Sequence, residues 1–303
     1  MKKHRFKNFI PTWINHGNLC IPSNKKTGEV KSVLSNCNLI FFASVGREGS
    51  GFMGNLFSEA SECITFHERR PFANGRKLIE NSMSNPYFSQ RNNRVKLSKI
   101  ADDITRTKAR TYVESNHMFI KTFGKELLNI YDISFTLVSL RRPIVDTLKS
   151  FSDLNWFGKV FSRASNWVYK IDANTPLKRN ELIIDSNLDE AIGYILSEKL
   201  NESNFLKNDQ NKRINYIIVN IPPRDEDIKI LKKLIGLDSP NFSLTSYKNT
   251  RYSLKTNSIT KKNCEEVLVD FLLKNKLALL NQGISFNINS KLININELSW
   301  SII

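Results

Sequence analysis

The chain has 303 residues, of which 40% are hydrophobic and 10% aromatic, so it can bury a large core as one α/β domain with or without an appendage. No run of about 18 apolar residues occurs, and the basic start is interrupted by Pro11 and lacks a small-residue cleavage site, which argues against a transmembrane helix or a signal peptide. Four scattered cysteines without a CxxC pair, and only four histidines, argue against a disulfide framework or a structural zinc site. We therefore expect a cytoplasmic protein with reduced cysteines.

The formal net charge of +16 indicates that the protein attracts anions, for which nucleic acid, an acidic membrane or a polyanionic cofactor and substrate are the candidates. The basic residues are spread along the chain rather than concentrated on one helix, and no nucleic-acid-binding motif is recognisable. Nucleic acid is therefore not the expected main partner.

An apolar, β-prone run over 38–45 leads directly into a glycine-rich turn and then into a helical pattern. Gly46, Gly49 and Gly51 allow the backbone to turn sharply and to direct successive N–H groups inward. Ser50 lies where a hydroxyl meets an anion at a helix N-terminus, and Arg47 adds a fixed positive charge. The pattern predicts a phosphate-binding loop, with an ordinary Gly-rich β-to-α turn as the alternative.

The spacing Gly46-x4-Gly51 matches the start of a Walker A loop, but the residues that follow do not. Phe52 and Met53 stand where a nucleoside triphosphatase has Lys and then Ser or Thr. Without these residues, the γ-phosphate and Mg²⁺ lose their usual P-loop ligands. The loop therefore predicts a nucleotide site that requires neither a γ-phosphate nor a metal.

Two further strands are expected to end in ionisable residues. The run 63–66 is followed by a cluster that can hold an acceptor or form a salt-bridged turn, namely His67, Glu68, Arg69 and Arg70. The next strand places Glu114 at its end, where a carboxylate close to a phosphate loop can accept a proton from an attacking hydroxyl. The alternatives are that Glu114 caps a helix or pairs with an Arg, and that His117 is the base instead.

A near-continuous apolar run over 133–140 is typical of a strand buried on both faces of a parallel sheet. It ends in Arg141 and Arg142, and Pro143 suits the first turn of a helix that carries Ser150. Two arginines at a strand end and a hydroxyl on the next helix can bind a second phosphate.

These motifs together resemble the P-loop sulfotransferases, which use 3′-phosphoadenosine 5′-phosphosulfate (PAPS). Residues 47–50 are similar to the 5′-phosphosulfate loop of that family, where Lys or Arg, a spacer, Gly and then Ser or Thr follow a buried strand. Arg142, Asp146 and Ser150 reproduce the spacing of its 3′-phosphate motif, although relatives with Arg-x-Pro would place Arg141 in that role. Residues 111–119 resemble the strand that carries the catalytic Glu in glycan-modifying members, and 151–158 resemble the aromatic continuation of bacterial members.

The resemblance implies an α/β fold with a P-loop-type parallel sheet flanked by helices, no metal, and sulfuryl transfer to an acceptor hydroxyl of a carbohydrate or glycolipid. The expected catalytic set is Glu114 as general base, which the resemblance implies, with Arg47, and with His117 as the rival base that the sequence itself offers. The cofactor-binding set that it implies is Arg47, Glu48, Gly49, Ser50, Gly51, Phe52, Arg142 and Ser150. The cluster from His67 to Arg70 would bind the acceptor. The alternatives are a degenerate P-loop kinase and a non-enzymatic protein that binds nucleic acid or an anionic glycan.

The domain organisation expected is an irregular leader over 1–36, the sulfotransferase-like domain over 37–240, and an extension over 241–303 that packs on the same domain. Helices are expected at 73–84, 94–108, 188–206, 225–234 and 263–275, with a further strand at 214–221. Residues 160–207 are expected to wall the acceptor pocket. In the extension, Arg251 and Lys255 are the candidates to close over the 3′-phosphate.

Overall fold

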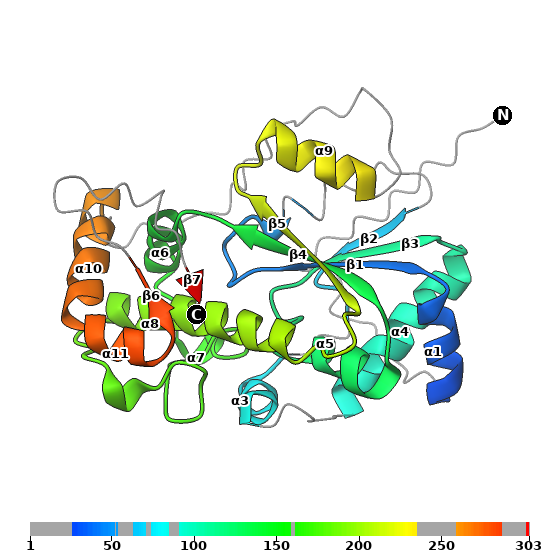
Figure 1. Ribbon diagram of the computed structural model, residues 1–303, viewed down its shortest axis with the longest axis horizontal. Helices are drawn as coiled ribbons and strands as arrows, with labels where there is room; N and C mark the ends of the chain where they lie inside the picture. The colour runs from blue at the N-terminus through cyan, green and yellow to red at the C-terminus, as the bar shows by residue number, and fades with distance from the viewer. Residues whose placement is uncertain are drawn as a thin grey trace.

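Five parallel strands form the central sheet, in the order β2-β3-β1-β4-β5. The computed structural model describes residues 26–51, 53, 63–70, 74–84, 91–158, 161–234, 259–286 and 301–302. The strands are β1 (Asn38–Ala43), β2 (Cys63–His67), β3 (Thr111–Ser115), β4 (Phe135–Arg141) and β5 (Ile214–Asn220). The expectation of an α/β fold with a parallel sheet flanked by helices is confirmed (Figure 1).

The central strand β1 is buried on both faces, as expected of a strand inside a parallel sheet. Leu39 and Phe41 pack into one hydrophobic cluster, while Ile40 and Phe42 pack into another on the opposite face. Helices α1 (Thr27–Ser35), α4 (Arg91–Thr107) and α5 (Phe123–Glu126), with the π-turn η1 (Leu127–Tyr131), cover the first face; α9 (Asp225–Leu234) covers the second (Figure 1).

A third cluster lies beyond the carboxyl ends of the strands. It is built mainly by α6 (Ile144–Asp153), α8 (Asn187–Lys207) and α10 (Lys261–Lys274), which pack on one another. The shorter elements are α3 (Arg76–Ser84), α7 (Phe161–Ala164), η2 (Arg179–Glu181), α11 (Lys276–Asn281), and the two-stranded sheet of β6 (Ile284–Ser285) and β7 (Ser301–Ile302). Among the helices that the structure describes, none is long and apolar enough to cross a bilayer.

The strand order places a switch point at the carboxyl end of β1. The chain leaves β1 toward the edge strand β2 on one side, whereas β4 pairs with β1 on the other side. In open parallel sheets, the crevice at such a point is where ligands bind. The glycine-rich turn begins at this end of β1. It therefore lies at the position where a sheet of this topology favours a ligand site.

One expectation about the leader is wrong. Residues 27–35 form helix α1 instead of irregular chain, because Val30 and Leu34, one helical turn apart, are buried against the sheet layer. Each such burial stabilises the fold by about 1.5–3 kcal/mol. The remainder of the leader lies outside the described residues, as do Gly236 and most of the first part of the extension.

Candidate functional site

The glycine-rich turn has the backbone geometry of an anion cradle. Gly46, Arg47 and Gly49 adopt positive φ angles of 94°, 60° and 86°, and the backbone is helical at Ser50, Gly51 and Met53. A side chain at Gly49 would place its Cβ 3.2 Å from Ile221 in addition to the unfavourable φ, so glycine is required there. Turns of this kind direct successive N–H groups into one concavity. Phe52, also expected in this loop, lies outside the described residues.

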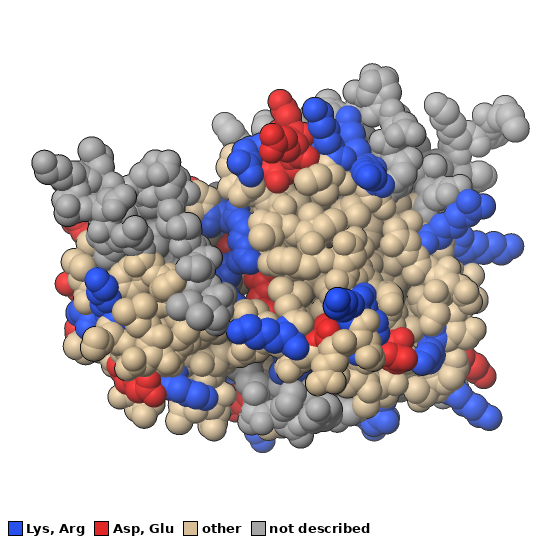
Figure 2. All heavy atoms as spheres, in the orientation of Figure 1, with Lys and Arg blue, Asp and Glu red and all other residues tan. Residues whose placement is uncertain are grey.

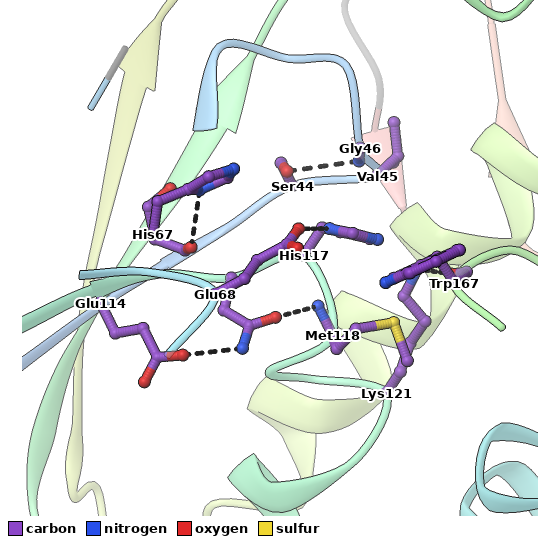
Figure 3. Close-up of polar contacts among 12 residues, drawn as sticks. Ser44, Val45, Gly46, His67, Glu68, Glu114, His117, Met118, Lys121 and Trp167 are labelled. Atoms are coloured by element: carbon purple, nitrogen blue, oxygen red, sulfur yellow. Dashed lines mark hydrogen bonds and ion pairs between the residues drawn. The ribbon is translucent and has the colours of Figure 1, made fainter. Parts of the chain in front are cut away.

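The start of the loop is held from behind by buried side chains. The carboxylate of Glu48 accepts a hydrogen bond from the Val45 N–H at 2.8 Å and lies 3.4 Å from the Lys199 ammonium on α8. Tyr194, also on α8, donates its hydroxyl to the Val45 carbonyl at 2.8 Å. The Ser44 hydroxyl accepts from the Gly46 N–H at 3.2 Å (Figure 3). These contacts fix the loop before any ligand arrives.

The side chain of Glu48 does not lie where it could contact a cofactor directly. Its side chain is buried, and burial raises its pKa while the neighbouring Lys199 opposes that shift. Burial likewise lowers the pKa of Lys199. The side chain of Glu48 is therefore part of the support of the loop, and only its backbone remains a candidate for contact with an anion.

The loop and helix α6 meet, although they are far apart in the sequence. Arg47 donates its Nε–H to the Ser150 hydroxyl at 2.9 Å across a separation of 103 residues. Arg142 donates from one terminal nitrogen to the carbonyl of Arg47 at 2.8 Å. The two predicted anion-binding elements are thus a single cluster at the carboxyl edge of β1 and β4. On the face drawn in Figure 2, Lys and Arg side chains gather in the hollow between the sheet and the α6–α8–α10 layer.

Arg141, the last residue of β4, and Arg142, which follows it, contact different neighbours. Arg141 donates to the Tyr216 hydroxyl at 2.8 Å and to the Glu202 carboxylate at 3.2 Å. Arg141 is therefore engaged between β5 and α8, whereas Arg142 reaches the loop. Asp146, one turn after Arg142, forms an ion pair of 3.0 Å with Lys261 of α10 and so joins α6 to the C-terminal helices.

Glu114 lies in a fully buried hydrogen-bond network at the end of β3. Its Oε1 accepts from the Arg69 N–H at 3.0 Å, the Lys96 ammonium at 2.6 Å and the Asn116 amide at 2.8 Å, and its Oε2 accepts from the Tyr112 hydroxyl at 2.6 Å. A carboxylate oxygen has about two lone-pair sites, so Oε1, with three donors, is saturated, while Oε2 keeps one site inside the fully buried network. The geometry is that of an ion pair joining β3, α4 and the turn after β2.

His117 lies against the loop and is oriented by Glu68. Its Nδ1 is 2.8 Å from the Glu68 carboxylate, and its ring is 3.7 Å from the position of a Cβ on Gly46 (Figure 3). Burial lowers the pKa of His117, partly offset by the charge of Glu68. Burial opposes the charge on Glu68, but His117, His67 and Lys96 outweigh it and lower the pKa of Glu68 to about 2. Because Glu68 faces Nδ1 as a carboxylate, the Nδ1 of His117 carries the proton that is donated to it.

The second ring nitrogen of His117, Nε2, has surroundings that differ from those of Nδ1. Its Nε2 is buried and has no hydrogen-bond partner in the described part of the chain. In Figure 3 that side of the ring points toward the indole of Trp167. An unpartnered buried polar atom is costly, so a ligand group or an ordered water at Nε2 would supply the missing hydrogen bond.

The cluster expected to bind an acceptor is divided. His67 donates to the Ser115 carbonyl at 3.2 Å and Glu68 holds His117, so both lie at the loop side. Arg69 instead turns to the buried Asp103 of α4, at 2.6 and 3.2 Å. Arg70 follows it and is half-buried. The structure thus joins His67 and Glu68 to the loop and directs the guanidinium of Arg69 to α4.

Several residues of this region were not predicted from the sequence. Lys96, Tyr194, Lys199 and Glu202 support the residues described above from α4 and α8. A signal was present, because polar residues recur every fourth position along α8, namely Glu190, Tyr194, Glu198 and Glu202, all of them buried. Such a stripe marks a helix face that meets other polar groups inside the protein. Arg251 and Lys255 lie outside the described residues, within which no cluster of metal-ligating side chains occurs.

Comparisons with known proteins do not assign the chain to a family. No protein-family model matches the chain, and no characterised protein is significantly similar to it in sequence. We therefore base the functional proposal on the geometry of this site and on the motifs that form it.

Proposed function

We propose that the protein is a PAPS-dependent sulfotransferase of the P-loop type. The observation that carries the proposal is the cluster formed by Arg47, Arg142 and Ser150, in which two anion-binding elements meet beside a glycine cradle at the switch point. PAPS has two anionic ends, a 5′-phosphosulfate and a 3′-phosphate, which match these two elements. Arg142 donates only one of its five N–H groups to the protein contact given above, which leaves donors for a phosphate.

The residues present fit this co-substrate better than a nucleoside triphosphate. Phe52 and Met53 replace the Lys and the hydroxyl residue that hold a γ-phosphate and Mg²⁺. The glycine cradle lies next to His117, so a group bound in the cradle is close to a base. In this proposal, the 46–51 loop with Arg47 holds the 5′-phosphosulfate, and Arg142 and Ser150 hold the 3′-phosphate.

Within the proposal, His117 is the proton acceptor and Glu68 orients it. As the acceptor hydroxyl attacks sulfur, its proton passes to Nε2 of His117, and the bond from sulfur to the bridging phosphate oxygen breaks. The electron pair of that bond remains on the bridging oxygen, which gives adenosine 3′,5′-bisphosphate. Arg47 and the loop N–H groups stabilise this charge, and one well-placed donor of this kind is worth roughly 3–4 kcal/mol. The Glu68 carboxylate stabilises the imidazolium that forms.

Glu114 has a different role in this account from the one that the sequence motif implies. Its side chain is fully buried, accepts four hydrogen bonds and is paired with the buried Lys96, so an acceptor hydroxyl does not reach it in this structure. We therefore assign it to positioning, since it fixes the backbone of Arg69 next to Glu68. Figure 3 shows Glu114 linked through Asn116 to the backbone of Met118, next to His117.

A transfer assay tests the proposal. The protein is incubated with PAPS carrying a radioactive sulfuryl group and a panel of hydroxyl acceptors that includes simple glycosides, glycolipids and phenols. The proposal predicts label transfer to at least one acceptor, and loss of about 10²–10⁴-fold of the rate in His117→Ala. Binding of ATP or single-stranded DNA in preference to adenosine 3′,5′-bisphosphate would instead favour a kinase or a nucleic-acid-binding protein.

A further inference from the structure

Lys121 is a buried cation close to the candidate base. It follows His117 by four residues, in the turns that join β3 to α5, and its side chain is fully buried. A lysine is very seldom buried completely unless its ammonium group is paired. The contacts of this ammonium group therefore indicate what the residue does in the fold.

The Lys121 ammonium reaches acceptors on two segments that are distant in the sequence. Its Nζ is 2.6 Å from the Tyr194 hydroxyl and 3.5 Å from the Glu198 carboxylate, both on α8. It also donates to the Trp167 carbonyl at 3.0 Å. An ammonium group has three N–H donors, so these three acceptors use all of them. Lys121 therefore connects α8 with the segment that carries Trp167.

The contact with Tyr194 extends to the glycine-rich loop. The Tyr194 hydroxyl accepts from Lys121 and donates to the carbonyl of Val45, where the loop begins. The Trp167 segment, which Lys121 holds by its carbonyl, carries the indole that the His117 ring faces (Figure 3). One ammonium group thus holds both the start of the loop and the segment next to the base.

The charge of Lys121 also acts on the imidazole of His117. In the described part of the chain, the groups that face this ring from other elements are Glu68, in the turn after β2, and His67, the last residue of β2. Burial lowers the pKa of His117 most, Glu68 opposes this shift, and the Lys121 ammonium adds to it. A base has to be neutral before it accepts a proton, so the charge of Lys121 favours the reactive form of the ring.

Glu198 is the main group that balances the charge of Lys121. Burial lowers the pKa of Lys121, and three carboxylates oppose this shift, in decreasing order those of Glu198, Glu68 and Glu48. The second oxygen of Glu198 accepts from the Tyr169 hydroxyl at 2.6 Å. The carboxylate is therefore fixed by a neutral donor as well as by the lysine.

We propose that Lys121 is a positioning residue of this site, whose ammonium group ties the start of the glycine-rich loop to the Trp167 segment beside His117. It thereby keeps the anion cradle and the proton acceptor in a fixed relative position, although it touches neither the nucleotide nor the acceptor. The inference rests on the proposed function, in which His117 is the base.

The first test follows the protonation of His117 by NMR, in ligand-free protein whose histidine rings carry ¹³C. The signal is identified by its absence in His117→Ala. Lys121→Met keeps a long, flexible side chain but removes the charge, and it is expected to raise the pKa of His117. Glu198→Gln is the matched control, because it breaks the same buried ion pair and leaves the lysine in place. It is expected to lower the pKa of His117 or to leave it unchanged.

The two variants distinguish a specific effect of Lys121 from a loosened interior. If loss of the ion pair only admitted water, both substitutions would raise the pKa of His117 toward its ordinary value, because burial would be relieved in both. A rise in both variants, or no rise in Lys121→Met, would overturn the inference.

The second test measures the affinity for adenosine 3′,5′-bisphosphate by calorimetry. Tyr194→Phe removes the hydroxyl that joins Lys121 to Val45 and leaves every charge in place. It is expected to weaken binding about 2- to 12-fold, which corresponds to one hydrogen bond, and it remains informative if Lys121→Met fails to fold. The double variant is expected to bind no more weakly than Lys121→Met alone, since both changes act on one contact.

Wild-type affinity in Tyr194→Phe, or losses that add in the double variant, would contradict the connection between Lys121 and the loop. Failure of the wild type to bind the bisphosphate would count against the sulfotransferase proposal. In that event the NMR titration, which uses no ligand, would still decide whether Lys121 acts on His117.

Discussion

The variant Glu114→Gln distinguishes between two roles of Glu114, that of a partner in a buried ion pair and that of a catalytic base. The amide keeps the shape and most of the hydrogen bonds of the carboxylate, but it removes the charge that faces the fully buried Lys96 ammonium at 2.6 Å. Loss of one partner of a buried pair costs about 3–5 kcal/mol, because the other charge remains without compensation. In a domain of this size, that loss lowers Tm by about 5–10 °C. Turnover measured well below the new Tm is expected to fall by less than about tenfold.

A double variant shows whether the loss arises from the pair itself. Lys96→Met alone is expected to destabilise the protein to a similar extent, and Lys96→Met with Glu114→Gln by clearly less than the sum, since no isolated charge remains. Free energies of unfolding come from denaturant titration, and rates come from the transfer assay. Unchanged stability in Glu114→Gln together with a 10²–10⁴-fold slower rate would refute the reasoning and make Glu114 the base.

Three further predictions concern the loop, the phosphate site and the base. Gly49→Ala is expected to weaken adenosine bisphosphate binding at least tenfold in a calorimetric titration, because of its φ of 86° and the 3.2 Å approach to Ile221; wild-type affinity would show that the turn is not the cradle. Arg142→Ala is expected to lose about 1.5–3 kcal/mol of that affinity, or about 10- to 150-fold, and Ser150→Ala less; no loss in either would exclude this phosphate site. The rate with wild-type protein is expected to fall only below pH 6.5, the ordinary pKa of His, because burial lowers the pKa of His117 and the base must be neutral; a rate that falls with rising pH over this range would contradict the assignment.

The sheet was predictable because its strands carry their own signals. The runs that became β1 and β4 are almost wholly apolar, and each ends in a turn or an arginine pair, so their burial and direction follow from the sequence. Helix α9 was also expected at the residues where it lies, from its apolar spacing. By contrast, α1 has a weak pattern in a polar segment, and its stability depends on contacts with the distant α4.

The loop and the strand ends of the candidate site were predictable from the sequence. The hydrogen bonds and ion pairs of their side chains were not. Parallel strands bring their carboxyl ends to one edge, so the meeting of Arg47 with Ser150 follows from the topology. The partner of Glu114 did not follow, since Lys96 is a lysine on a helix that the sequence marks only as amphipathic. The choice between Arg141 and Arg142 likewise depends on Glu202 and Tyr216, which no local pattern links to β4.

The central claim is that the 46–51 loop with Arg47, and Arg142 with Ser150, hold the two ends of one nucleotide within the cluster that they form. The most direct test compares the calorimetric affinities of adenosine 3′,5′-bisphosphate and adenosine 5′-phosphate, which differ only in the 3′-phosphate. The account predicts that the bisphosphate binds about 10- to 150-fold more tightly to the wild type, and that this advantage largely disappears in Arg142→Ala but remains in Arg106→Ala, an exposed arginine on α4. Equal affinity of the wild type for the two nucleotides would contradict it.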